Sequence, residues 1–241
     1  MSQIWIGTSG YQYRHWRHGV FYPQNLPLKD EFTYYSQIFK TVEINSTFYG
    51  IPKETVWENW AARAPADFLY ALKVNRTLTH TLKLENLQNS WQIFFAKAQK
   101  LREHLGPILF QLPPNFSAHP EKLKSLARVL PKNCRFAFEF RHQSWFTAEI
   151  FQILRQNGWA LVIMSSQNLP FIPEVTADFV YLRFHGPKQL YCSNYTLKEL
   201  SVYADLIKNW QAQNLDIYAY FNNDFDGFAP KNALALQKLL T

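Results

Sequence analysis

The sequence lacks several features that mark common protein classes. It has only two cysteines, Cys134 and Cys192, so a disulfide framework is not expected. No apolar run approaches the ~20 residues that a membrane-spanning helix needs, and no block of five like charges marks a binding tail. The chain opens almost directly into a strand-like run, Ile4–Thr8, without the regions of a secretory signal. We therefore expect a cytoplasmic protein that does not enter a membrane.

Motifs that hold metals or nucleotide phosphates are also missing. There is no His-x-x-x-His or Cys-x-x-Cys spacing, no Walker lysine pattern and no dinucleotide fingerprint. The stretch Asn222–Gly227 resembles the first half of a calcium loop, but Ala233 stands where a bidentate glutamate is required. We expect no metal and no cofactor.

What the sequence does contain is aromatic and basic. Phe, Tyr and Trp make up 17% of the residues, and 25 basic against 18 acidic side chains give a formal charge of +7. A positive balance favours anionic partners such as phosphates, nucleotides or nucleic acid, although it is as typical of a mildly basic soluble protein.

Apolar strand-like runs alternate with amphipathic, helix-like segments along the whole chain. The expected strands are Ile4–Thr8, Lys40–Thr47, Phe68–Val74, Gly106–Leu112, Arg135–Arg141, Trp159–Met164, Asp178–Phe184 and Leu215–Phe221. Helices are expected near Lys29–Ile38, Glu54–Arg63, Ser90–Glu103, Pro120–Val129, Ala148–Asn157 and Leu197–Asn209, and from about Pro230. The count and length predict an α/β fold, a single-domain TIM-like (β/α)8 barrel over residues 1–241. A doubly wound open sheet is the alternative.

One unit of this pattern is irregular. Ser165–Ala177, between strands six and seven, is short and contains Pro170 and Pro173. The helix after strand six is therefore expected to be short or missing.

Polar side chains lie on one alternating face of six strand-like runs, toward their carboxyl ends. They are Glu43, Asn45, Lys73, Gln111, Glu139, Arg141, Arg183, His185 and Asn222. Side chains alternate across a strand, and burying charges is costly unless they are paired or face water. The pattern predicts a shared polar cavity at the end of the barrel where such enzymes build active sites.

Several short and uncommon sequence motifs point to a family resemblance. They are Gly7–Tyr11 with Phe21-Tyr22-Pro23, Val42–Tyr49, Gln111-Leu112-Pro113, Arg141-His142 with Ser144-Trp145, Tyr181–Gly186 and Tyr220–Asn223. Together they resemble the YecE-like family, a domain-of-unknown-function family, over nearly the whole chain. The resemblance implies a TIM-barrel-like fold and no particular activity. Relatives often carry an aspartate after strand six, where this chain reads Met164-Ser165-Ser166.

Glu43 and Glu139 are the first candidates for an acid/base pair, with His185 as a third catalytic candidate, because carboxyl groups in different environments can divide these roles. The expected substrate-binding set is Asn45, Tyr49, Lys73, His80, Gln111, Arg141, His142, Arg183 and Asn222. Three of its members are cations suited to an anion. In the alternative, these cations pair with the two glutamates as a structural lattice. A metal held by the histidines is disfavoured by the same cations.

The loop Tyr11–Pro27 interleaves aromatic and basic residues, which suits either base stacking with phosphate contact or a small packed lid. The leading hypothesis is an enzyme, a hydrolase or isomerase, acting by acid/base chemistry on an anionic, phosphate-bearing small molecule or nucleotide. The alternatives are a nucleic-acid-binding protein, with or without nuclease activity, and a non-catalytic structural barrel.

Overall fold

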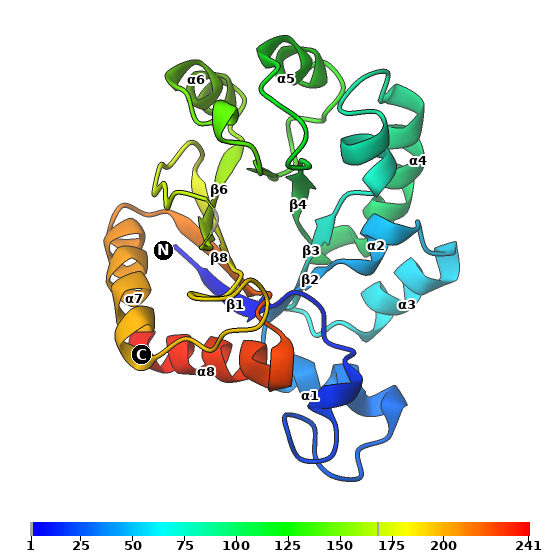
Figure 1. The fold of residues 1–241 in the computed structure, drawn as a ribbon. Coiled ribbons are helices and arrows are strands. Elements are labelled where there is room, and N and C mark those ends of the chain that lie inside the picture. Colours follow the sequence, from blue (N-terminus) through cyan, green and yellow to red (C-terminus); the bar gives the residue numbers. More distant parts are fainter. Residues whose placement is uncertain (1, 168) are drawn as a thin grey trace. The chain divides into compact units, whose positions relative to one another are not determined.

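A computed structural model describes residues 2–167 and 169–241, and strands and helices alternate along most of the chain (Figure 1). The strands are β1 (Ile4–Thr8), β2 (Thr41–Ile44), β3 (Leu69–Lys73), β4 (Leu105–Gln111), β5 (Phe136–Glu139), β6 (Ala160–Ser165), β7 (Phe179–Phe184) and β8 (Asp216–Phe221). Their order in the sheet is β1-β8-β7-β6-β5-β4-β3-β2. This sequential parallel order confirms the (β/α)8 class.

The helices are α1 (Glu31–Ile38), α2 (Ser46–Tyr49), α3 (Glu54–Arg63), α4 (Gln88–Ala98), α5 (Pro120–Leu126), α6 (Ala148–Gln156), α7 (Leu197–Ala212) and α8 (Phe228–Leu240). Local sequence explains several of their ends. Pro120 opens α5 at a position where its missing N–H costs nothing. Thr196 and Glu199 form a reciprocal capping box at the start of α7.

The described residues group into two compact units. Unit 1 holds those within Met1–Glu43, Ile163–Pro173 and Phe179–Thr241, and unit 2 holds those within Ile44–Val162 and Glu174–Asp178. The boundary falls inside β2 and β6. The prediction of a single domain stays a prediction, and each unit is described by itself.

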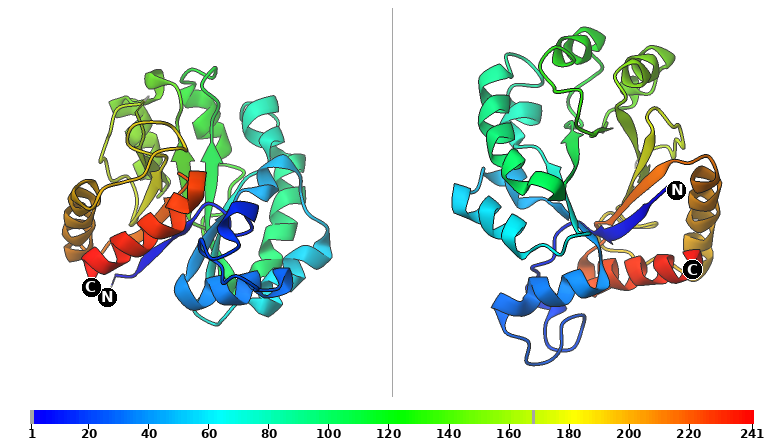
Figure 2. Two further views of the ribbon diagram at one scale, coloured as in Figure 1. Left: turned by 60° about the horizontal axis from the view of Figure 1, so that its bottom comes forward. Right: turned by 180° about the vertical axis from the view of Figure 1, so that it is seen from behind.

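In unit 1, β8 lies between β1 and β7, and both pairings are parallel and in continuous register. Helices α7 and α8 pack on each other, and α8 also packs along β1, as the two views in Figure 2 show. The hydroxyl of Tyr35 bridges the first two strands: it accepts from the Thr8 N–H (3.1 Å) and donates to the Thr41 carbonyl (3.0 Å). A side chain thus replaces ladder hydrogen bonds where β2 approaches β1.

In unit 2, β3, β4 and β5 form a parallel ladder with one irregularity in β3 between Tyr70 and Leu72. The core beside it is aromatic. The Phe110 ring stacks on Phe138, with centroids 5.2 Å apart, and Trp91 packs against Phe110.

The strand and helix predictions hold at most positions, and α3 has the predicted bounds Glu54–Arg63. The strand predicted over Lys40–Thr47 is wrong beyond Ile44, because the chain turns into α2 at Ser46. Similarly, Arg141 lies two residues past the end of β5. No helix joins β6 to β7 in the described part of that segment, as its prolines predicted. None of the helices within residues 2–167 and 169–241 has the length and apolarity to cross a membrane.

Candidate functional site

The predicted site residues fall into two clusters, one in each unit. Unit 1 contains Glu43, Arg183, His185 and Asn222, and unit 2 contains Asn45, Tyr49, Lys73, His80, Gln111, Glu139, Arg141 and His142. The proposed division of acid and base roles between Glu43 and Glu139 stays a prediction, because these residues belong to different units.

Glu43 and Arg183 form a buried ion pair in unit 1. The guanidinium Nη2 lies 2.6 Å from Glu43 Oε1, and the two residues are 0% and 1% exposed. Ser9 Oγ also donates to Oε1 (2.7 Å), and the Tyr181 hydroxyl donates to Oε2 (2.8 Å). Burial alone would raise the pKa of the Glu43 carboxyl, but Arg183 and the two hydroxyl donors hold it below its usual value. We call these four residues the Glu43 cluster.

Sequence reasoning missed Ser9 and Tyr181 as partners of Glu43. Tyr181 shares the alternating face of Arg183 on β7, so its parity was an available signal. Ser9 follows β1 in a loop that has no periodicity. Its partner Glu43 is 34 residues away in the sequence, and only folding brings the two side chains together.

His185 and Asn222 come together at the ends of β7 and β8, where the Asn222 Nδ2 and His185 Nδ1 atoms are 3.3 Å apart. The histidine is fully buried, and its ring meets the edge of Tyr191. The strands thus bring these two predicted residues into contact.

In unit 2, four polar side chains lie at the carboxyl ends of the neighbouring strands β3, β4 and β5. Lys73 Nζ donates to Gln111 Oε1 (2.6 Å), and the Arg141 Nε donates to Glu139 Oε1. Gln111 and Glu139 are register partners on β4 and β5, so they lie side by side. Glu139 is fully buried, whereas Lys73, Gln111 and Arg141 are half-buried and reach solvent.

His80 adjoins the same group of residues from the turn after β3. Its ring packs against Phe48, over which Lys73 Nζ lies 4.1 Å from the ring centroid. Burial, followed by the charges of Lys73 and Arg76, lowers the pKa of His80 to about 4. We call Lys73, His80, Gln111, Glu139 and Arg141 the Lys73 cluster.

Three other predicted residues belong to unit 2. Asn45 precedes α2, and its Oδ1 is a buried acceptor without a hydrogen-bond partner among residues 2–167 and 169–241. Tyr49 ends α2 and is 78% exposed. His142 accepts a backbone hydrogen bond from Ser144 and lies 2.8 Å from its hydroxyl, so its ring caps a local turn.

The aromatic loop 11–27 packs as a small core. Tyr11, Trp16 and Tyr22 are buried, and the Tyr22 hydroxyl donates to the Tyr11 carbonyl. The rings therefore pack down as a small core, which is one of the two arrangements predicted for this loop. Nucleic-acid binding stays a prediction.

A contact that sequence reasoning missed joins this loop to the end of β8. Asp224 accepts from the Trp16 indole N–H, and its Oδ2 lies 2.9 Å from His15 Nε2. Burial raises the pKa of the Asp224 carboxyl to about 6, against the opposing effect of His15. No local signal could reveal a contact between residues 209 apart in the chain.

The stability of the protein should depend on Asp224 between pH 3.8 and about 6. In that window the folded state binds more protons at this carboxyl than the unfolded chain, so rising pH lowers the free energy of unfolding. Urea unfolding at several pH values should show a loss of roughly 1–2 kcal/mol across the window that is absent in Asp224→Asn. The exposed Asp205→Asn serves as the control. Equal pH profiles for Asp224→Asn and the wild type would contradict the assignment.

Comparison with known proteins identifies the family but not an activity. A family model described as "Protein of unknown function DUF72" matches residues 5–241. The chain is 24% identical over 270 residues to the UPF0759 protein YunF of Bacillus subtilis (strain 168), covering 98% of this chain and 94% of YunF. It is 28% identical over 141 residues to the UPF0759 protein YecE of Escherichia coli (strain K12), covering 55% of this chain and 51% of YecE.

Two solved structures share the fold. The crystal structure of a DUF72 family protein from Thermotoga maritima MSB8 matches 99% of each chain with 28% identity and a TM-score of 0.89. A DUF72 family protein from Enterococcus faecalis V583 matches 99% of this chain and 95% of its own, with 21% identity and a TM-score of 0.84.

Proposed function

We propose, for a chain that belongs to the DUF72 family of proteins of unknown function, that it is an enzyme acting by acid/base chemistry on a phosphate-bearing small molecule. The substrate binds in unit 2, at the carboxyl ends of β3, β4 and β5. The observation that supports this most directly is the row of Lys73, Gln111 and Arg141, which reach solvent beside the buried carboxylate of Glu139.

The chemistry of the two cations suits a phosphate group. A guanidinium presents a planar fork that can contact two phosphate oxygens, and an ammonium adds a compact positive charge. Gln111 orients Lys73 through its carbonyl oxygen and leaves its amide N–H groups for the ligand. The buried Asn45 Oδ1 can accept from a hydroxyl group of the same molecule.

Glu139 and His80 are the proton-transfer groups of this proposal. His80 is neutral near pH 7 because burial and nearby positive charge lower its pKa to about 4. A bound dianion offsets that positive charge and raises the pKa of His80 toward neutrality, where a histidine is an effective general base. Substrate binding therefore improves the base.

The Glu43 cluster has a structural role in this proposal. Glu43 accepts from three side-chain donors and is fully shielded from solvent, and Arg183 is shielded with it. We therefore assign ligand binding to the partly exposed cations of unit 2.

Inorganic phosphate should raise the pKa of His80 by roughly 1–3 units, measured by NMR titration of the imidazole resonances. Lys73→Gln should abolish this dependence on phosphate because Lys73 is the cation with the larger effect on the pKa of His80. Lys132→Gln is the matched control: Lys132 is exposed and precedes β5, at the opposite end of that strand from Glu139.

The same wild-type and variant proteins should then be screened by thermal unfolding with phosphorylated small molecules. A ligand at a hundredfold excess over its Kd adds about 2.7 kcal/mol to the stability of the native state. If neither phosphate nor any phosphorylated compound shifts His80 or the melting temperature, the proposal is wrong.

A further inference from the structure

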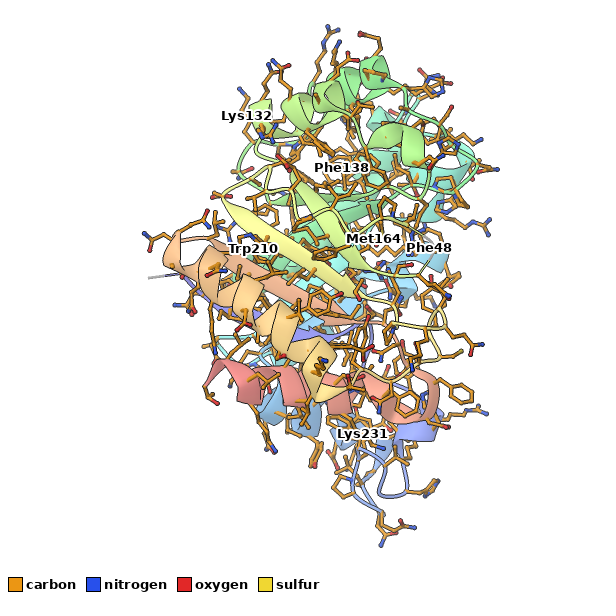
Figure 3. The ribbon with its side chains drawn as sticks, turned by 60° about the vertical axis from the view of Figure 1, so that its left-hand side comes forward. Phe48, Lys132, Phe138, Met164, Trp210 and Lys231 are labelled. Atoms are coloured by element: carbon orange, nitrogen blue, oxygen red, sulfur yellow. The ribbon has the colours of Figure 1, made fainter. Side chains whose placement is uncertain are left out.

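A cavity lies in unit 1, at the carboxyl end of β6, and none of the residues of the proposed function lines it. Its volume is about 320 Å³, within the range of small-molecule sites. Met164, which marks this end of β6 in Figure 3, lines it together with Phe171, Val202 and Tyr203. Phe171 and Val202 are apolar and exposed, and the Phe171 ring meets Tyr203 edge to face.

Three hydroxyl groups meet at the wall of this cavity. Tyr195 and Tyr203 each donate to Ser165 Oγ at 2.7 Å, and the Gly186 N–H donates to the Tyr195 hydroxyl. Burial raises the pKa of both tyrosines, so their hydroxyls remain protonated donors at neutral pH. Ser165 is 6% exposed, and its Oγ donates no hydrogen bond within residues 2–167 and 169–241.

The hydroxyl proton of Ser165 lacks an acceptor among the described residues. Ser165 Oγ accepts two hydrogen bonds, which leaves its own proton without an acceptor among the described residues. A buried donor left unsatisfied costs free energy. A ligand oxygen or ring nitrogen in the cavity would satisfy it.

The charge at the rim restricts the ligand further. Glu199 lines the cavity, and its Oε2 accepts from the backbone N–H and hydroxyl of Thr196 at 2.8 Å each. A carboxylate here repels an anion. The capping box also occupies the backbone N–H groups of Thr196 and Glu199 at the start of α7.

From these observations we propose that the cavity binds a planar aromatic molecule that carries one hydrogen-bond acceptor and no negative charge. The ring lies among Met164, Phe171 and Tyr203, and the acceptor takes the Ser165 proton. Rings pack edge to face or offset against aromatic side chains, and sulfur makes favourable contacts with them. This site disfavours the negative charge that the phosphate site of unit 2 requires, and it does not depend on that proposal.

Benzamide and benzoate test this proposal because they share a shape and differ in charge. Benzamide at up to about 10 mM should shift the NMR signals of the Met164 and Val202 methyl groups with a roughly millimolar Kd. Benzoate should bind at least tenfold more weakly. Ser165→Ala should weaken benzamide roughly two- to tenfold. Ser201→Ala should not change it, because Ser201 lies on α7 but does not line the cavity and its hydroxyl donates to the Lys198 carbonyl.

Glu199→Gln isolates the effect of charge, since glutamine also completes a capping box and the helix start is preserved. Benzoate should bind this variant within about threefold of benzamide, because the repulsion that accounts for the difference is removed. The proposal is overturned if benzamide leaves the Met164 and Val202 signals unchanged, or if the wild type binds both probes equally. It is equally overturned if Ser165→Ala binds benzamide as the wild type does.

Discussion

Replacing Arg183 with methionine should lower the free energy of unfolding by roughly 3–5 kcal/mol. Methionine fills the space of the arginine stem with a long apolar side chain. It leaves the fully buried Glu43 carboxylate without the cation that lies 2.6 Å away in the wild type. The hydrogen bonds from Ser9 and Tyr181 remain, and they do not neutralise the charge. The double variant with Glu43→Gln should recover part of the loss because no charge is then buried alone.

Urea unfolding with Arg155→Met as the matched control measures this effect. Arg155 pairs with Glu174 at the surface, where both side chains are well exposed, so its loss should cost no more than about 1 kcal/mol. If Arg183→Met unfolds like that control and phosphate stabilises only the wild type, Arg183 is an anion ligand instead. The Glu43 assignment would then fail.

The Glu43 carboxyl should also make the protein less stable as the pH falls. Its pKa in the folded protein is lower than the ordinary 4.5. The stability that the ionised group contributes is therefore fully present above that value and is lost as the pH falls through the folded pKa.

Gly7→Ala should cost about 3 kcal/mol, at the upper end of the usual penalty for overpacking. A Cβ at this position would lie 2.2 Å from the Thr41 carbonyl oxygen and 3.1 Å from the Tyr35 hydroxyl. The first of these atoms belongs to the backbone of β2 and cannot rotate away. The added methyl group therefore has to separate β1 from β2 and weaken the bridge that Tyr35 makes between them.

Gly50→Ala is the matched control, because a Cβ there meets no atom within 4 Å and the backbone is extended. It should be neutral or stabilise the protein by up to about 1 kcal/mol through the entropy of the unfolded chain. Chemical denaturation of the two variants compares them directly. Equal stabilities would show that β1 and β2 do not approach each other as closely as described.

The sequence by itself determined the order of the elements and the face on which each strand side chain lies. Strand alternation has a period of two and depends only on the local backbone, so Tyr181 and Arg183 share a face wherever β7 lies. The start of α7 is equally local, because Thr196 and Glu199 satisfy each other's backbone N–H groups. Strand ends were less certain, and the run predicted to Thr47 stops at Ile44 where α2 begins.

Only the tertiary structure decided which polar groups pair and which stay accessible. Glu43 meets Arg183 across 140 residues of sequence, and Asp224 meets Trp16 across 208. Alternation had placed Lys73 and Arg183 in one equivalent set of cations, yet the first reaches solvent and the second is buried. Pairing and burial depend on the register between strands and on which loops cover their ends. These are set by packing between distant segments, which leaves no local trace in the sequence.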